Sequence, residues 1–183
     1  MLLYHTGEGI IREPDVHAGR SNADFGPGFY LSPDREFTRR WARCEAVVNV
    51  YELDLDGLEV LRLQRSLPWV EFILRNRQGH GAAGADVVIG PIANDTLFET
   101  MGLITGGFFS PEQMLALLQV GPAYVQAAVR TERATAQLRW IRAEPVIRLD
   151  EELRLWEQEA YQQELAEAAA RLLGQEDEQA PVS

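Results

Sequence analysis

Residues 24–32 read Asp-Phe-Gly-Pro-Gly-Phe-Tyr-Leu-Ser, and this stretch decides the fold together with Leu-Tyr-His-Thr-Gly at residues 3–7. Two glycines flanking a proline predict a loop whose backbone can approach a ligand closely. The segment 29–31 that follows predicts a short strand, and residues 3–7 predict a second strand with one imidazole. The two strands together predict a cleft lined by His5 and Tyr30.

The bulk composition is that of an ordinary globular protein. The chain has 183 residues and is 46% hydrophobic, which predicts one main domain with a core of normal size. No apolar run is long enough to cross a bilayer, and no secretion-signal pattern opens the chain, so we expect a cytoplasmic protein without a membrane partner. Cys44 is the single cysteine and is predicted to be a buried apolar residue. The three histidines are scattered, and we expect no metal site.

The charge is unevenly distributed along the chain. The formal net charge is −11, and residues 150–183 hold ten acidic residues against two arginines. No broad basic stripe is present, which argues against a tight non-specific nucleic-acid binder. We therefore expect a domain at residues 1–148, an acidic C-terminal helix at 149–174 and a frayed tail at 175–183.

Strand and helix patterns are mixed along the chain without regular alternation, which favours an α+β fold over a doubly wound sheet. Alternating or β-branched segments predict strands at 2–6, 29–31, 47–53, 58–63, 86–92, 125–130 and 138–141. Periodic apolar residues and start signals predict helices at 33–43, 68–75, 94–101 and 110–118. Ser-Pro pairs predict N-caps at Ser32 and Ser110.

Three residues near the start invite both a structural and a functional interpretation. His5 is either a strand histidine bonded to a backbone carbonyl or a partner for a ribose hydroxyl. Tyr30 is either a core aromatic residue or a flat face that stacks on a positively charged pyridinium ring. Arg20 is either an ordinary surface arginine or a fork for a pyrophosphate.

Other polar residues of the middle region favour a structural interpretation. We expect Asn76 and Arg77, with Asp86 and Asp95 flanking a buried strand, to form structural hydrogen bonds or ion pairs. Several nucleotide-binding and hydrolase signatures are missing: the chain has no GxxxxGK[ST] loop, no GxGxxG opening a helix and no GxSxG elbow. The absence of these motifs argues against a P-loop enzyme and against a Rossmann dehydrogenase.

Three segments resemble the motifs of the ADP-ribosyltransferase superfamily of the poly(ADP-ribose)-polymerase and diphtheria-toxin type. Tyr4-His5 resembles the first motif, the glycine loop with Tyr30 the second, and a strand led by Gln126 takes the place of the third. The chain looks closer still to a poorly characterised bacterial family of this clan. That family carries LYHGS, R, DFGxGFYL, WA, NR, IGPxAxD and QxxFxTExA in order. The matching segments here are 3–7, Arg20, 24–31, 41–42, 76–77, 89–95 and 126–134.

The resemblance implies a split β-sheet core with peripheral helices and NAD⁺ as substrate. In that family's chemistry His5 bonds the nicotinamide ribose, the backbone at Thr6 pairs with the carboxamide, and Tyr30 stacks on the nicotinamide. Gln126 stands where the best-known members have a catalytic glutamate, so the implied catalytic set is His5, Tyr30 and Gln126. The remaining implied NAD⁺-binding residues are Tyr4, Thr6, Gly7, Arg20, Phe25, Gly26, Gly28 and Phe29.

The side chain at Gln126 limits the implied chemistry. A carboxamide can hydrogen-bond a ribose hydroxyl, but it carries no charge and takes no proton at neutral pH. The resemblance thus implies an NAD⁺-dependent mono-ADP-ribosyltransferase that releases nicotinamide, with NAD⁺ hydrolysis as a variant and no metal. The acceptor is a protein, a nucleic acid or a small molecule. A bacterial toxin with a protein antitoxin as partner, or a phage-defence protein, fits the small size. The alternative is an inactive member that binds NAD⁺, another nucleotide or a protein.

Overall fold

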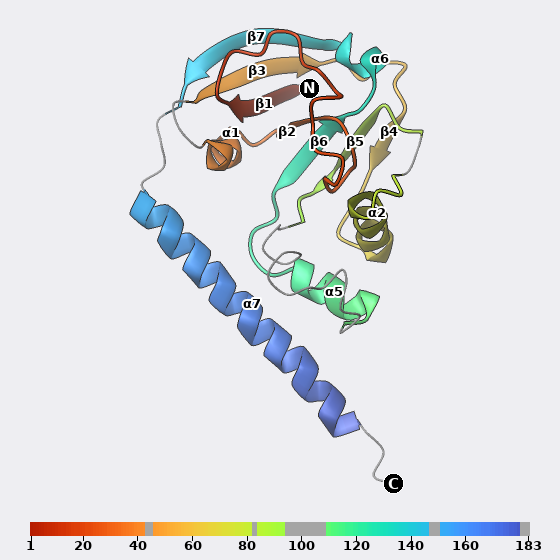
Figure 1. Ribbon diagram of the computed structural model, residues 1–183, viewed down its shortest axis with the longest axis vertical. Coiled ribbons are helices and arrows are strands. Elements are labelled where there is room, and N and C mark those ends of the chain that lie inside the picture. The colour runs from red at the N-terminus through yellow and green to blue at the C-terminus, as the bar shows by residue number, and fades with distance from the viewer. Residues whose placement is uncertain (43–45, 82–83, 94–108, 147–150, 180–183) are drawn as a thin grey trace. The chain divides into compact units, whose positions relative to one another are not determined.

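The computed structural model describes residues 1–42, 46–81, 84–93, 109–146 and 151–179 (Figure 1). The chain forms two compact units. The first consists of Met1–Ile92 and Tyr124–Leu149, and the second of Ala93–Ala123 and Asp150–Ser183. The first unit holds both β-sheets and every residue of the site predicted from the sequence. Cys44, Asp95 and the helix predicted at 94–101 lie outside the described residues.

A three-stranded antiparallel sheet forms one layer of the first unit (Figure 1). Its strands, in spatial order, are β1 (Leu2–Gly7), β3 (Val47–Leu53) and β7 (Leu138–Pro145). The β3 bounds are those predicted from its alternating β-branched residues. β7 continues beyond the predicted 138–141, because its pairing with β3 extends to Pro145.

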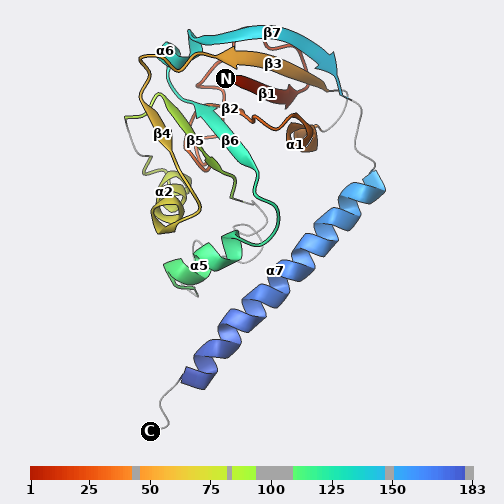
Figure 2. The ribbon, with the colours of Figure 1, turned by 180° about the vertical axis from the view of Figure 1, so that it is seen from behind.

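The second sheet has four strands, and Figure 2 shows it from behind. Its spatial order is β2 (Phe29–Leu31), β6 (Val125–Val129), β5 (Val87–Pro91) and β4 (Val60–Arg62). β4 and β5 run parallel, whereas the other neighbours are antiparallel. The fold is therefore α+β with two sheets, as the mixed sequence pattern predicts.

The apolar core fills the space bounded by alternate residues of both sheets. Side chains alternate between the two faces of a strand, so Phe29 and Leu31 on β2 share a face with Ala127 and Val129 on β6. These four residues belong to one buried cluster that also includes Leu3 of β1. By the same alternation, Tyr30 and Gln126 lie on the opposite face of the four-stranded sheet.

The first helix begins later than predicted. The segment consists of α1 (Arg35–Thr38) and a 3₁₀ turn, η1 (Arg39–Trp41), and its N-cap is Asp34, whose carboxylate accepts from the Phe37 amide. The prediction of Ser32 as cap was wrong. Ser32 is fully buried, its backbone pairs with Tyr4, and its hydroxyl donates to the Val125 carbonyl. Its capping role therefore passes to Asp34.

The other helices follow their sequence signals more closely. Ser110 caps α5 with a full capping box, as predicted. α7 (Glu151–Gln179) continues past residue 174, where the helix was predicted to end, to the last described residue. None of the described helices contains an apolar stretch that could cross a membrane. The remaining helices are α2 (Leu67–Arg77), α5 (Pro111–Leu118), α6 (Glu132–Thr135) and α7 (Glu151–Gln179).

Candidate functional site

β1 and β2 come together at a single backbone bridge. The Tyr4 amide donates to the Ser32 carbonyl at 2.8 Å, and the Ser32 amide donates to the Tyr4 carbonyl at 2.9 Å. In a continued antiparallel ladder the next pair on this edge would be Thr6 opposite Tyr30. The described chain forms no such pair, and the bridge stays isolated. The two sheets separate at this point.

The imidazole of His5 forms a hydrogen bond with the Tyr30 carbonyl, the backbone acceptor at the point where the ladder stops. Its Nδ1 lies 2.7 Å from the Tyr30 carbonyl oxygen. A carbonyl oxygen only accepts, so Nδ1 carries the proton and Nε2 has a free lone pair. Burial lowers the pKa of His5 below its usual 6.5, against the opposing effect of the Tyr30 hydrogen bond. At neutral pH, His5 therefore presents Nε2 as a hydrogen-bond acceptor.

Two aromatic rings pack near the His5 ring, and a glycine leaves space beside it. The ring centroid lies 4.5 Å from that of Phe29 and 5.9 Å from that of Trp41. A Cβ added at Gly7 would lie 3.2 Å from Nε2, so glycine at this position leaves space beside the lone pair. Thr6 points away from the ring: its hydroxyl donates to the Thr38 hydroxyl at 3.0 Å.

The glycine loop is fastened to Tyr30 by two hydrogen bonds. The Tyr30 hydroxyl donates to the Gly26 carbonyl at 2.7 Å and accepts from the Phe25 amide at 3.0 Å. Gly26 has a φ of 78°, which favours glycine. Burial, as the largest cause, raises the pKa of the Tyr30 phenol, so the hydroxyl stays protonated. Tyr30 as a whole residue is only partly buried.

Two arginines lie beside this loop. A Cβ added at Gly26 would lie 3.6 Å from Nη2 of Arg130, and one added at Gly28 would lie 3.3 Å from its Cγ. Arg20 follows Gly19, which packs against the Gly28 carbonyl, and the charges of both arginines act on the Tyr30 phenol. Arg20 is one of the binding residues that the resemblance implies, whereas Arg130 was not named in the sequence analysis.

Gln126 lies in a buried polar chain beneath the loop. Its Nε2 donates to Oδ2 of Asp24 at 3.0 Å, and Nε of Arg77 donates to Oδ1 of Asp24 at 2.8 Å. Gln126 and Asp24 are each 6% exposed. The Asn76 amide donates to the Phe72 carbonyl. The prediction of structural bonds for Asn76 and Arg77 is thus confirmed, although Arg77 also supports a predicted site residue.

Three of the predicted binding residues contact the junction only through their backbone or through a buried ring. Phe25 is fully buried and packs edge-on against Phe72, while Phe29 belongs to the core. Tyr4 is on the face of β1 opposite to His5, because neighbouring side chains of a strand alternate. Only its backbone contributes to the junction. The other predicted residues lie on three strands and the glycine loop: His5, Thr6 and Gly7 on β1, Tyr30 on β2, Gln126 on β6, and Gly26, Gly28 and Arg20 on or beside the loop.

Residues 1–140 match a protein family that is described as "Protein of unknown function (DUF3990)". The chain belongs to the DUF3990 family. The matched range includes every motif segment from residue 3 to residue 134. No curated protein and no solved structure matches the chain. The family description names no activity, so the ADP-ribosyltransferase interpretation of this DUF3990 member stays a prediction.

Two residues of the site in this DUF3990 chain had no clear sequence signal. Asp24 opens the glycine loop and Arg130 directly follows β6, so both lie inside quoted motif segments, but neither was assigned a role. Their roles depend on contacts between distant segments. Among the described residues, no group of three or more His, Cys, Asp or Glu side chains could hold a metal ion.

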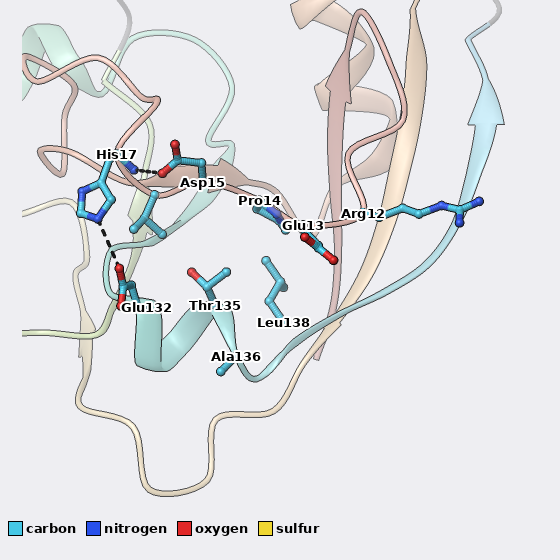
Figure 3. Close-up of a pocket in the computed structure, with 10 residues that line it drawn as sticks. Arg12, Glu13, Pro14, Asp15, His17, Glu132, Thr135, Ala136 and Leu138 are labelled. Atoms are coloured by element: carbon cyan, nitrogen blue, oxygen red, sulfur yellow. Dashed lines mark hydrogen bonds and ion pairs between the residues drawn. The ribbon is translucent and has the colours of Figure 1, made fainter.

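A separate pocket of about 460 Å³ lies between the loop at residues 12–17 and the α6–β7 corner (Figure 3). His17 spans its rim, where its Nε2 lies 3.8 Å from a Glu132 carboxylate oxygen and its backbone amide donates to Asp15. None of the predicted site residues lines this pocket. Its lining residues are Arg12, Glu13, Pro14, Asp15, Val16, His17, Glu132, Thr135, Ala136 and Leu138.

Proposed function

We propose that the protein is an NAD⁺-dependent mono-ADP-ribosyltransferase that releases nicotinamide. One observation carries the proposal: the Nδ1 of His5 bonds the Tyr30 carbonyl at the point where the two sheets separate. This contact joins the two residues that the resemblance assigns to nicotinamide recognition. We propose further that the two sheets form the split core of an ADP-ribosyltransferase fold.

The residues at the junction have groups that suit each part of NAD⁺. Nε2 of His5 would accept a hydrogen bond from a hydroxyl of the nicotinamide ribose. The N–H and C=O of Thr6 lie on the same strand edge as those of Tyr4, where they would pair with the carboxamide. The Tyr30 ring would stack on the nicotinamide. The positive charges of Arg20 and Arg130 beside the loop suit a pyrophosphate.

The carboxamide of Gln126 defines the kind of transfer. A carboxamide can accept a hydrogen bond from a ribose hydroxyl, but it cannot take a proton from an acceptor. Repeated addition onto ribose hydroxyls calls for a base that removes the hydroxyl proton, and a carboxamide does not supply one. We therefore propose mono-transfer, and place the protein as the toxin of a bacterial toxin–antitoxin or phage-defence pair that acts in the cytoplasm.

The test is NAD⁺ consumption with nicotinamide release by the full chain. We expect His5→Asn to abolish turnover, because the asparagine amide can replace Nδ1 but offers no group at the position of Nε2. The matched control is His17→Asn, which alters an exposed histidine of the separate pocket and should retain wild-type turnover. A wild-type rate equal to that of His5→Asn would disprove the enzymatic proposal.

A second candidate is a member that binds NAD⁺ without turning it over. The hydrogen bond of Gln126 to Asp24, which Arg77 also contacts, favours this candidate. An amide fixed in this way can bind a ligand but transfers no proton. Calorimetric titration with NAD⁺ beside the turnover assay separates the two candidates. Binding with no nicotinamide release by the wild type supports the second candidate, whereas release that depends on His5 supports the first.

A further inference from the structure

A buried polar chain connects the glycine loop, strand β6 and helix α2. Asp24 of the loop accepts from Gln126 of β6 through Oδ2 and from Arg77 of α2 through Oδ1. The Asp24 and Arg77 side chains are 6% and 11% exposed, so the ion pair is shielded from water. The Asp24–Gln126 hydrogen bond joins residues 102 positions apart in the chain.

The charge of Asp24 fixes which end of the Gln126 amide faces it. An ionised carboxylate accepts hydrogen bonds and donates none. The donating arginine beside it favours the ionised form, because an opposite charge within a few ångströms stabilises the charged state. Gln126 must therefore present its NH₂ group to Asp24. The carbonyl oxygen, Oε1, is left on the other end of the amide as an acceptor.

The position of Gln126 places that acceptor on the face of Tyr30. Tyr30 is paired with Ala128 across β2 and β6, and Gln126 precedes Ala128 by two residues on the same strand. Residues two apart share a face. The same loop that carries Asp24 also carries Gly26, whose carbonyl accepts from the Tyr30 hydroxyl. Asp24 therefore acts at the base of the proposed nicotinamide site.

We propose that Asp24 is a positioning residue for Gln126, which it holds so that the amide oxygen is offered to a ribose hydroxyl of NAD⁺. This inference rests on the proposed function. It also explains why glutamine occupies position 126 in this chain. A glutamate there would bring a second carboxylate about as close to Asp24 as the amide nitrogen is now, at 3.0 Å, and two such charges repel.

Exchanging the two functional groups tests the proposal. In Asp24→Asn, the asparagine oxygen keeps the hydrogen bond to Arg77 and its NH₂ group faces Gln126. The Gln126 amide must then turn its oxygen inward and its nitrogen toward the ligand. In the double variant Asp24→Asn/Gln126→Glu, the new NH₂ group donates to the new carboxylate, and an acceptor oxygen again faces the ligand. The double variant keeps one acid in the network.

The experiment compares the full-length wild type, both single variants and the double variant by calorimetry with NAD⁺ and by thermal unfolding. We expect each single variant to bind NAD⁺ at least ten-fold more weakly and to unfold at a lower temperature. We expect the double variant to recover most of the affinity and to be more stable than either single variant. A double variant no better than the weaker single variant, or an Asp24→Asn variant with wild-type affinity, would overturn the proposal.

A second measurement does not require the Asp24 variant to fold. The titratable groups that face position 126 in the described contacts are Asp24 of the loop and, through it, Arg77 of α2. In Gln126→Glu, the new carboxyl group should hold its proton to unusually high pH, so its stability deficit should shrink as the pH falls toward 5. A stability deficit that is constant with pH would contradict the pairing.

Failure of the proposed function can be told apart from failure of this inference. Wild-type protein that fails to bind NAD⁺ would refute the proposed function, and the unfolding data alone would then decide the Asp24–Gln126 pairing.

Discussion

The Nδ1 of His5 donates to the carbonyl oxygen of Tyr30 at 2.7 Å. This hydrogen bond lies next to the Tyr4–Ser32 bridge, the only one described between the two sheets. A side chain thus takes the backbone acceptor that the Thr6 amide would use in a continued ladder. The contact links β1 to β2. It also leaves the backbone N–H and C=O of Thr6 without a partner strand, among the described residues, on this edge of β1. Under the proposed function, one imidazole therefore serves both structural support, through Nδ1, and ligand recognition, through Nε2.

Substitution of His5 should separate these two tasks. His5→Ala removes the donor to Tyr30, which should cost about 1 kcal/mol of unfolding free energy, in addition to lost ring packing. His5→Asn should retain more stability, because its amide N–H can donate to the same carbonyl. Both variants should lose NAD⁺ affinity. Chemical denaturation and calorimetry measure the two effects, and equal stabilities for the two variants would contradict the donor role of Nδ1.

The pH dependence of stability should report the buried His5 ring. The unfolded chain takes up this proton near the usual pKa of 6.5, whereas burial lowers the pKa in the folded state. The unfolded state then binds more protons just below pH 6.5, so the unfolding free energy falls as the pH decreases. This part of the fall should be missing in His5→Asn.

Denaturant titrations of both proteins between about pH 7 and about pH 5 measure this difference. Three carboxyl groups have pKa values lowered chiefly by a hydrogen bond: Glu36 by Arg39, Asp86 by Thr131 and Glu144 by Arg35. These groups therefore titrate below the pH range of the experiment. His17 and His80 are present in both proteins and cancel in the comparison. Parallel curves for wild type and variant would show that His5 does not resist protonation.

Removal of the Tyr30 hydroxyl should loosen the glycine loop while leaving the ring. Tyr30→Phe eliminates the bonds to the Gly26 carbonyl and the Phe25 amide, which should cost about 1–3 kcal/mol because buried backbone groups lose their partner. Hydrogen exchange at the Phe25 amide should become faster. Tyr4→Phe is the matched control, since its hydroxyl makes no hydrogen bond within the described part of the chain. Unchanged exchange at Phe25 would refute the fastening.

The close packing of Gly19 on Gly28 should make position 19 intolerant of any side chain. A Cβ at Gly19 would lie 2.3 Å from the Gly28 carbonyl oxygen, so Gly19→Ala must displace the loop at a cost of about 1–3 kcal/mol. Gly9→Ala is the control from the same irregular segment, because nothing lies within 4 Å of its added Cβ. Thermal unfolding compares the two variants. Equal midpoints would show that the segments do not touch as described.

Local sequence patterns predicted those parts of the fold whose signals lie within a few residues. The alternating residues of 47–53 and the aromatic run 29–31 gave correct strand bounds, since β propensity and alternation are local properties. The Ser110 capping box was correct for the same reason. The equivalent signal at Ser32 failed, because a bridge to Tyr4 and a bond to Val125 compete for that residue.

The sequence alone determined which residues are available for the candidate site: an imidazole at His5, a tyrosine after a glycine loop, and a carboxamide at Gln126. Tertiary structure alone decided which atoms of these residues remain free. Pairing of His5 with Tyr30 leaves Nε2 as the acceptor, and pairing of Gln126 with Asp24 leaves Oε1. The physical reason is that a hydrogen bond consumes one donor and one acceptor. Which pairs form depends on strands and loops that lie 25 and 102 residues apart and meet only in the folded chain.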